Sequence, residues 1–452
     1  MKLAKLSLAA IVVAGLASSS FAASDNLADA FKNGKVNGEL RAWYFDRDTG
    51  VAPTAARYTA ANVGKQGQES LFSTAVILGY VTDSLYGLSL GTTFQSNYAP
   101  FASDAAKQMY GADMYGSGAV LSEAYVAYTI GKTTAKVGRQ FISTPLVSGS
   151  GSRMIKESFE GGLVINTDVP QTTLAAGYVG KFQGRTTRAI DATLTGAQSD
   201  IPEFSKNAVF YGVGVASFDG AYTVLAINQS VPNLTITGQY ARVNNVADTV
   251  VGDADVYVGA LGYILPVSNF KLGFDGAYQK SKTDKEVQLD GNMVGLQASL
   301  IDLAGFGAKL GYTTTSNSDD VILGMGNGAG GAVAFTAPLI AGASKVSTSN
   351  TDAYKVELSY DFSKVGVTGL KVMGQYIDIS ADGARTNTFN ARSANIDYKY
   401  WEGQISYDIP AVKGLTLSLE YEDCTKDTAA FGATAAATVD SSDMRFRANY
   451  KF

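Results

Sequence analysis

Apolar and polar residues alternate with a two-residue period at the end of the chain. In residues 443–452, one set of alternate positions reads Met, Phe, Ala, Tyr and Phe, and the other reads Asp, Arg, Arg, Asn and Lys. Successive side chains of a β-strand point to opposite faces, so this segment has an apolar face and a polar face. A strand between lipid and water needs this pattern, whereas a soluble sheet would leave the aromatic row exposed. The segment therefore predicts a membrane-spanning strand with Arg445, Arg447 and Lys451 on its water-facing side.

The same alternation recurs along the chain in segments of about ten residues, the length that a transmembrane β-strand needs. The first segment, 35–46, places Glu39 and Arg41 on its polar face. Short turns rich in Pro, Gly and Asn alternate with long polar loops, which is typical of antiparallel strands. We predict about eighteen strands. They are expected at 35–46, 69–82, 87–98, 120–130, 134–141, 159–169, 172–182, 221–231, 234–243, 254–265, 270–281, 291–301, 306–317, 353–362, 370–380, 395–409, 415–425 and 443–452.

The fold class predicted is all-β, a transmembrane antiparallel β-barrel, because closure leaves no unpaired backbone edge in lipid. Two regions leave the number of strands open between roughly 16 and 20. Residues 207–218 extend the eighth strand or form a hairpin of their own, and residues 318–352 are long enough to contain another hairpin. An even number of strands places both termini in the periplasm and the long loops outside. A barrel of this size encloses a water-filled lumen.

The first 22 residues predict a cleavable secretory signal. Lys2 and Lys5 form a basic start, residues 6–16 are apolar but too short to span a bilayer as a helix, and Ser20-Phe21-Ala22 has small residues at the positions that a signal peptidase reads. Residues 23–452 are therefore expected to form the mature barrel domain. The compartment expected is the outer membrane of a Gram-negative bacterium.

The composition narrows the classes of function. Histidine is absent from the 452 residues, which excludes Ser-His-Asp and Cys-His nucleophilic sites and imidazole metal sites. The net charge of −5 and the lack of a basic patch with interleaved aromatics give no support to nucleic-acid binding. Acidic residues in the predicted outer loops could bind a hard cation, but none has EF-hand spacing. We expect no enzyme and no cofactor, and we assign no metal-binding residue.

Residues 326–331 (Gly-Asn-Gly-Ala-Gly-Gly) satisfy the G-x-G-x-x-G pattern of dinucleotide-binding loops. That pattern has meaning only between a strand and a helix of a βαβ unit. The neighbouring sequence is typical of a β-barrel, so we interpret the segment as a flexible extracellular loop.

Residues 139–161 carry a more specific pattern. A predicted strand ending in Arg139-Gln140-Phe141 is followed by a Pro-containing stretch, by Ser152-Arg153, and by Phe159-Glu160-Gly161 at the start of the next strand. This arrangement resembles the third loop of the OprD family of outer-membrane porins, and residues 34–41 resemble the first strand of that family.

The resemblance implies an eighteen-stranded barrel, usually trimeric, with the third loop (about 142–158) folded into the lumen as the constriction. Ser152 and Arg153 match the family motif, and Lys156 and Glu157 lie within it. These four residues are the expected pore constriction. Glu39, Arg41, Arg445, Arg447 and Lys451 are expected to line the lumen.

We therefore expect a porin for passive diffusion of small hydrophilic solutes and ions. The expected partners are outer-membrane lipid, the barrel assembly machinery and two further copies of the chain. A final strand that ends on Tyr450 and Phe452 resembles the signal that this machinery reads. A non-conducting structural or adhesin-type barrel is the alternative, because long outer loops suit either role.

Overall fold

The computed structural model describes residues 24–50, 67–191, 194, 199–212, 214–248, 250–383, 385–386, 391–392, 394–430 and 435–452. The predicted secretory signal lies outside the described residues. Within them, no helix is both long and apolar enough to cross a bilayer.

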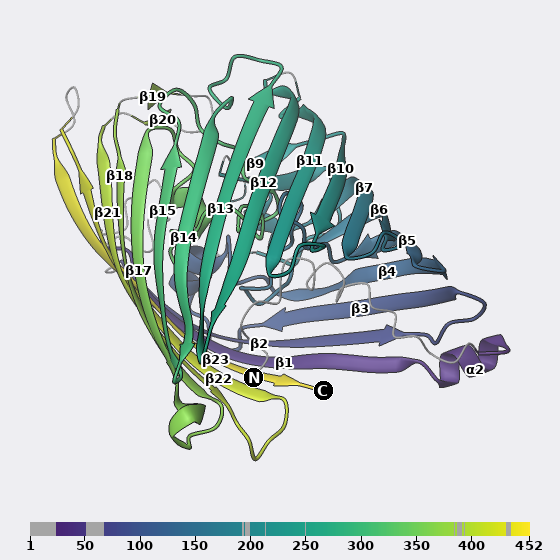
Figure 1. Cartoon of the computed structure of the whole chain (residues 1–452). Helices are drawn as coiled ribbons and strands as arrows, with labels where there is room; N and C mark the ends of the chain where they lie inside the picture. Colours follow the sequence, from purple (N-terminus) through teal and green to yellow (C-terminus); the bar gives the residue numbers. More distant parts are fainter. Residues whose placement is uncertain are drawn as a thin grey trace.

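Eighteen antiparallel strands form one closed wall, which confirms the predicted barrel. The strands follow one another in chain order, and β1 pairs with β23 to close the circle, so the purple and yellow ends of the chain lie side by side in Figure 1. The wall strands are β1 (Lys35–Asp48), β2 (Gln68–Val81), β3 (Leu88–Tyr98), β4 (Gly118–Ile130), β5 (Thr133–Gln140), β6 (Ser158–Asn166), β7 (Thr172–Gln183), β10 (Gly220–Asn228), β11 (Leu234–Val246), β12 (Gly252–Val267), β13 (Phe270–Thr283), β14 (Asn292–Leu303), β15 (Phe306–Thr315), β17 (Thr351–Asp361), β18 (Leu370–Ala381), β21 (Ile396–Asp408), β22 (Leu415–Thr428) and β23 (Ala437–Lys451).

The two regions that kept the strand count open do not contribute to the wall. Residues 207–218 contain a short hairpin, β8 (Asn207–Tyr211) and β9 (Gly214–Ser217), which pairs with β16 (Gly324–Met325) in a separate three-stranded sheet. A further pair, β19 (Arg385–Thr386) and β20 (Ala391–Arg392), lies in the loop after β18.

Helical segments are short. They are α2 (Leu27–Lys32), α3 (Asp104–Tyr110), and the 3₁₀ turns η2 (Thr187–Ala189), η3 (Ala343–Lys345) and η4 (Phe362–Val365). The helix α3 lies inside the barrel against β1 and β2, where the Tyr110 ring is fully buried and its centroid lies 6.1 Å from that of Phe45. The second long loop therefore folds inward.

The two-residue period of the sequence separates lipid-facing from lumen-facing side chains. On β23, Arg445 is 2 % exposed, whereas Phe446 and Phe452 are 40 % and 53 % exposed on the outer face. Outward aromatic residues of neighbouring strands lie in tilted pairs with ring centroids 4.6–5.0 Å apart. These pairs are Tyr178–Tyr222, Tyr240–Tyr257, Tyr312–Tyr354 and Tyr376–Trp401. Such a belt seats a barrel at the membrane interface.

The lumen is partly filled by inward-folded loops. We name these loops L2 (99–117), L3 (141–157), L4 (184–219) and L7 (316–350). Apolar side chains of L3, L4 and L7 form two buried clusters against the inner faces of the wall strands. The loops are long and carry apolar segments, and burying those segments stabilises them inside the barrel. The water-filled space is therefore narrower than the wall alone implies.

The Gly-rich segment 326–331 belongs to L7 and lies inside the lumen. Its interpretation as a flexible extracellular loop is therefore wrong. Gly326 donates its N–H to Val209 O of β8 at 2.8 Å, and Gly328 donates to Ser148 O of L3 at 3.0 Å. Gly326 has a φ of +85°, and a Cβ there would lie 2.4 Å from Ser148 O. Glycine is needed because two backbone segments approach closely.

The orientation of β23 can be tested at Ala448, which faces outward opposite Ala42, near the middle of β1. Arginine at this position should hamper folding, because a cation at the bilayer midplane costs about 2–4 kcal/mol in barrels. Ala448→Leu is the control and should fold normally. Heat-modifiable mobility on gels measures the folded fraction of each variant. Equal folding of the arginine and leucine variants would mean that Ala448 does not face lipid.

Candidate pore constriction

L3 crosses the lumen from β5 and β6 and joins L7. Val147 pairs in parallel with Met325, where Ser148 N donates to Met325 O at 2.9 Å and Met325 N donates to Leu146 O at 2.8 Å. Leu146 N also donates to the Gln239 side chain of β11 at 2.9 Å. Hydrogen bonds to L7 and to the wall thus hold the tip of L3 in place.

L7 is fixed to the other side of the wall by two buried carboxylates. Glu402 and Glu422 occupy opposed positions on β21 and β22 and are 6 % and 4 % exposed. Glu402 accepts the N–H of Leu339 at 2.8 Å, and Glu422 accepts those of Ile340 and Ala341 at 2.6 and 3.1 Å. These hydrogen bonds satisfy the backbone N–H groups of three consecutive residues of L7. They hold the middle of L7 against the wall.

Arg153 of L3 connects the two loops. Its Nη2 donates to Ile340 O of L7 at 3.2 Å, and its Nη1 donates to Ser152 Oγ at 3.2 Å. A cavity of about 490 Å³ opens between L2, L3, L4 and L7. Ser152, Arg153, Arg185 and Asp113 supply charged and polar atoms to its lining, and much of the rest is alanine and other apolar side chains of L7 and L4.

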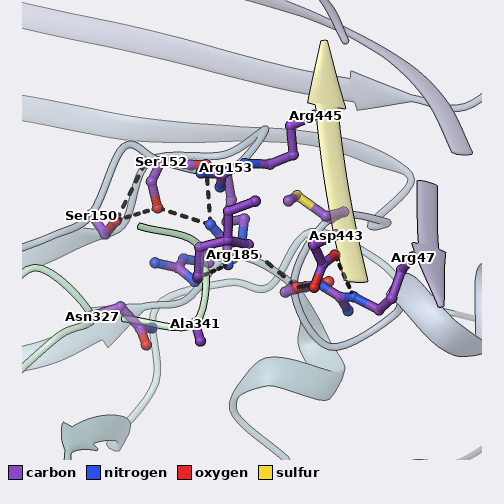
Figure 2. Close-up of polar contacts among 12 residues, drawn as sticks. Arg47, Ser150, Ser152, Arg153, Arg185, Asn327, Ala341, Asp443 and Arg445 are labelled. Carbon is purple, nitrogen blue, oxygen red and sulfur yellow. Dashed lines mark hydrogen bonds and ion pairs between the residues drawn. The ribbon is translucent and has the colours of Figure 1, made fainter. Parts of the chain in front are cut away.

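Four arginines and four carboxylates form a charged cluster beside this cavity, and Figure 2 shows part of it. Arg153, Arg185 and Asp113 of this cluster line the cavity. Arg47 bonds Asp443 at 2.8 Å and Asp113 at 3.2 Å, and the Nε of Arg153 lies 3.6 Å from the same Asp113. Arg185 of L4 lies 3.3 Å from Glu157. The side chain of Arg445, on β23, forms an ion pair with Glu420 at 2.5 Å. Residues far apart in the sequence therefore form one charged cluster at the junction of the inward loops.

Several guanidinium N–H groups of the cluster have no hydrogen-bond partner. They are the Nε atoms of Arg153, Arg185 and Arg445 and the Nη1 atom of Arg445, and the three side chains are nine-tenths buried or more. Two acceptors of the cluster, Asp113 Oδ1 and Glu420 Oε2, also make no hydrogen bond. Burial, together with the charges of Arg445 and Arg185, lowers the pKa of Arg153 to about 9. Burial raises the pKa of Asp113, but Arg47 and Arg153 outweigh it and lower this pKa overall.

Glu157 and Lys156 lie apart from the cavity lining. Glu157 is fully buried and accepts the N–H groups of Ser150 at 3.0 Å and Asn327 at 2.9 Å, so it ties L3 to L7. Lys156 places its Nζ 4.1 Å from the centroid of the Phe141 ring. Burial lowers the pKa of Lys156, while Glu123 raises it and Arg41 lowers it further. Its surroundings are thus the wall strands β1 and β4, below Arg153.

The remaining predicted residues lie along β1 and β23. Arg41 bonds Glu39 at 2.9 Å and donates to Arg153 O at 2.6 Å, so it supports L3 from the wall. Arg447 ion-pairs with Glu420 and lies over the Trp43 ring at 5.2 Å. Lys451 is exposed opposite Glu39.

The two residues of the predicted assembly signal, Tyr450 and Phe452, are exposed on the outer face of β23. Phe452 exchanges backbone hydrogen bonds with Gly38 at 3.0 and 3.1 Å, and so it takes part in closing the barrel.

From the sequence we did not single out Arg185, Asp113 or the pair Glu402–Glu422 as site residues, although Glu422 has the parity of a lumen-facing residue. Arg185 and Asp113 lie in loops, where no two-residue period indicates orientation. The glutamates did carry a signal, because both have inward parity on adjacent strands. Among the described residues, no group of three or more Cys, Asp or Glu side chains is arranged to hold a metal ion.

Comparison with known proteins identifies the fold and the family. No curated protein matches the sequence. The structure matches the crystal structure of Acinetobacter baumannii OccAB3 with a TM-score of 0.73 at 14 % identity, covering 93 % of this chain and 99 % of that one. Pseudomonas aeruginosa OccK8 (OprE) matches with a TM-score of 0.69 at 14 % identity, covering 93 % and 98 %. At these identities the similarity shows the fold alone.

The family model described as "outer membrane porin, OprD family" matches residues 29–452, nearly the whole chain. This match favours the porin over the adhesin-type barrel. It confirms the resemblance inferred from residues 139–161 and places the protein in the Gram-negative outer membrane. The chain belongs to the OprD family of outer-membrane porins.

Proposed function

We propose that this porin passes small hydrophilic solutes and ions by passive diffusion, and that it favours solutes carrying an anionic group. The observation that carries this proposal is the set of buried guanidinium N–H groups of Arg153, Arg185 and Arg445 that make no hydrogen bond. Arg153 and Arg185 line the cavity. We also propose that L3, together with L4 and L7, sets the narrowest passage.

Electrostatics supports the preference for anions. The carboxylates of Glu157, Glu402 and Glu422 accept hydrogen bonds from loop backbone or from side chains. Among the residues that line the cavity, the Nε groups of Arg153 and Arg185 lack a hydrogen bond, and so does one acceptor, Asp113 Oδ1. A charge in a narrow passage with low-dielectric walls acts strongly on a permeating ion, because the field is focused there. A solute oxygen would supply the missing acceptor.

The proposed roles of the L3 residues differ. Ser152 and Arg153 contact permeating solutes, and Arg445 adds to the positive potential from the wall. Glu157 is a positioning residue, because its bonds to Ser150 and Asn327 hold L3 against L7. Lys156, Glu39, Arg41, Arg447 and Lys451 would contribute charge to the lumen beyond the cavity.

Three further proposals concern biogenesis. Residues 1–22 direct secretion and are removed, the C-terminal Tyr450 and Phe452 are read by the barrel assembly machinery, and three copies assemble in the outer membrane. The outward exposure of both aromatic side chains supports their recognition. No catalytic activity and no cofactor are proposed.

The selectivity of the passage can be tested with Arg153→Gln, which removes the charge but keeps a hydrogen-bond donor. We expect the reversal potential in a salt gradient to shift towards cations, because a positive charge of the cavity lining is lost. Lys399→Gln is the control, because Lys399 faces outward on β21 and should leave the reversal potential unchanged. The same reversal potential for wild type and Arg153→Gln would contradict the role of Arg153.

The width of the passage can be tested by deleting residues 146–151. This deletion removes the pairing of Val147 with Met325, which joins the tip of L3 to L7. Single-channel conductance should rise, and larger sugars should enter in a liposome-swelling assay. If conductance and exclusion size both stayed at their wild-type values, L3 would not set the narrowest passage.

The assembly signal can be tested by deleting Phe452. We expect less folded barrel in the outer membrane and more protease-sensitive material, because a recognition element and two backbone bonds to Gly38 are lost. Lys451→Ser changes the neighbouring side chain, retains Phe452, and serves as the control. Unchanged levels of folded barrel after the deletion would refute the recognition role.

A further inference from the structure

Residues 339–341 of L7, which we call the L7 arm, lie between the cavity and the inner face of the wall. All three residues line the cavity on one side. On the other side, their backbone N–H groups donate to the side chains of Glu402 on β21 and Glu422 on β22. The bonds to the two glutamates therefore hold part of the cavity lining in place.

Glu402 and Glu422 form a buried pair of carboxyl groups. They occupy opposed positions on neighbouring strands and are close enough to interact directly. Glu402 accepts hydrogen bonds from the L7 arm and from the Gln375 amide, and both oxygens of Glu422 accept N–H groups of the arm. Within the described part of the chain, neither carboxyl group forms an ion pair with a lysine or arginine. The pair thus has hydrogen-bond donors but no neutralising partner.

Three cations lie near the pair, but each is directed to another group. Lys355 lies 3.8 Å from Glu357, and Arg445 ion-pairs with Glu420 at 2.5 Å. The Lys345 ammonium lies 5.2 Å from the centroid of a tyrosine ring of β21. The titratable and charged groups that face the pair are Lys345 of L7, Lys355 of β17, Tyr400 of β21, Glu420 and Cys424 of β22, and Asp443 and Arg445 of β23. From β18, the neighbouring side chain is the uncharged Gln375.

Two carboxyl groups in one buried site do not both ionise at neutral pH, because neither water nor a cation screens the repulsion between their charges. One proton shared by the pair relieves this repulsion. If the L7 arm leaves, water reaches the pair and both groups can ionise. The form with the arm in place therefore binds one proton more than the form with the arm released, and raising the pH favours release.

We propose that Glu402 and Glu422 share one proton and form a pH-sensitive switch, which holds the L7 arm against the wall at neutral pH and releases it at alkaline pH. Release moves part of the cavity lining, so the passage widens. Because one proton is lost, the ratio of released to held arms rises by at most about tenfold per pH unit. This inference rests on the proposed function, because the arm lines the passage proposed there, and it adds regulation of that passage by external pH.

Glu402→Gln and Glu422→Gln test the shared proton. A glutamine amide has the shape of a carboxyl group that is permanently protonated, because its NH₂ group donates to the remaining glutamate while its oxygen accepts from the arm. Each variant should therefore keep the arm held at alkaline pH. Asp275→Asn is the control, because it makes the same kind of change at an inward carboxylate of β13 that accepts a hydrogen bond from Gln297 at 3.2 Å.

The first measurement is the single-channel conductance of the full chain in planar bilayers, from neutral to alkaline pH. Conductance should rise with pH in wild type and in Asp275→Asn, and it should not rise in the two folded glutamine variants. No rise in wild type, or an equal rise in the glutamine variants, would overturn the proposal. Loss of the rise in Asp275→Asn would also overturn it, because the response would then follow lumen charge in general.

Cys424 provides a second readout that needs no ion flow. It is the only cysteine of the chain, is buried, and packs with Ala343 and Val346 of L7, next to the arm. At one alkaline pH, a membrane-impermeant maleimide should label it faster in wild type than in Glu402→Gln, whereas both should react equally slowly at neutral pH. Equal labelling at alkaline pH would contradict release of the arm. The anion preference is tested separately through Arg153→Gln, so either proposal can fail while the other stands.

Discussion

Every other feature of this porin depends on closure of the wall between β1 and β23. A membrane offers no water to unpaired backbone groups, so the last strand must pair with the first along its length. The pairing of Ala42 with Ala448 and of Phe45 with Arg445 fixes which side chains point inward on both strands. A shift by one residue would turn Arg445 and Arg447 towards lipid. The register of the β1–β23 pairing thus both closes the barrel and places these arginines in the lumen.

The inward loops solve a second problem of backbone pairing. L3 and L7 run through the lumen without a continuous sheet, so their N–H groups need acceptors from elsewhere. Glu157 accepts hydrogen bonds from N–H groups of L3 and of the start of the Gly-rich segment. Glu402 and Glu422 accept hydrogen bonds from the N–H groups of residues 339–341. Apolar packing of Leu146, Val147 and Met325 completes the junction. Removing one of these carboxylates would therefore loosen a loop as well as change a charge.

Most of the barrel could be predicted from the sequence, because each wall strand carries a two-residue period that membrane and water impose directly. The inward course of residues 326–331 could not be predicted, since Gly326 is explained only by its contact with Ser148 of a distant loop. Ser152 and Arg153 were found through their resemblance to a family motif. Arg185 and Asp113 were missed, because loop residues gain their orientation from tertiary packing alone.

The electrostatic character of the constriction follows from how the loops are anchored. Glu157, which ion-pairs with Arg185, also accepts bonds from loop N–H groups, and Asp113 is shared between Arg153 and Arg47. Buried donors are consequently left without acceptors beside the cavity. An unpaired buried N–H is costly, and a passing solute oxygen can relieve that cost for a short time. The interactions that position L3 and L7 thereby also create the preference for anions that we propose.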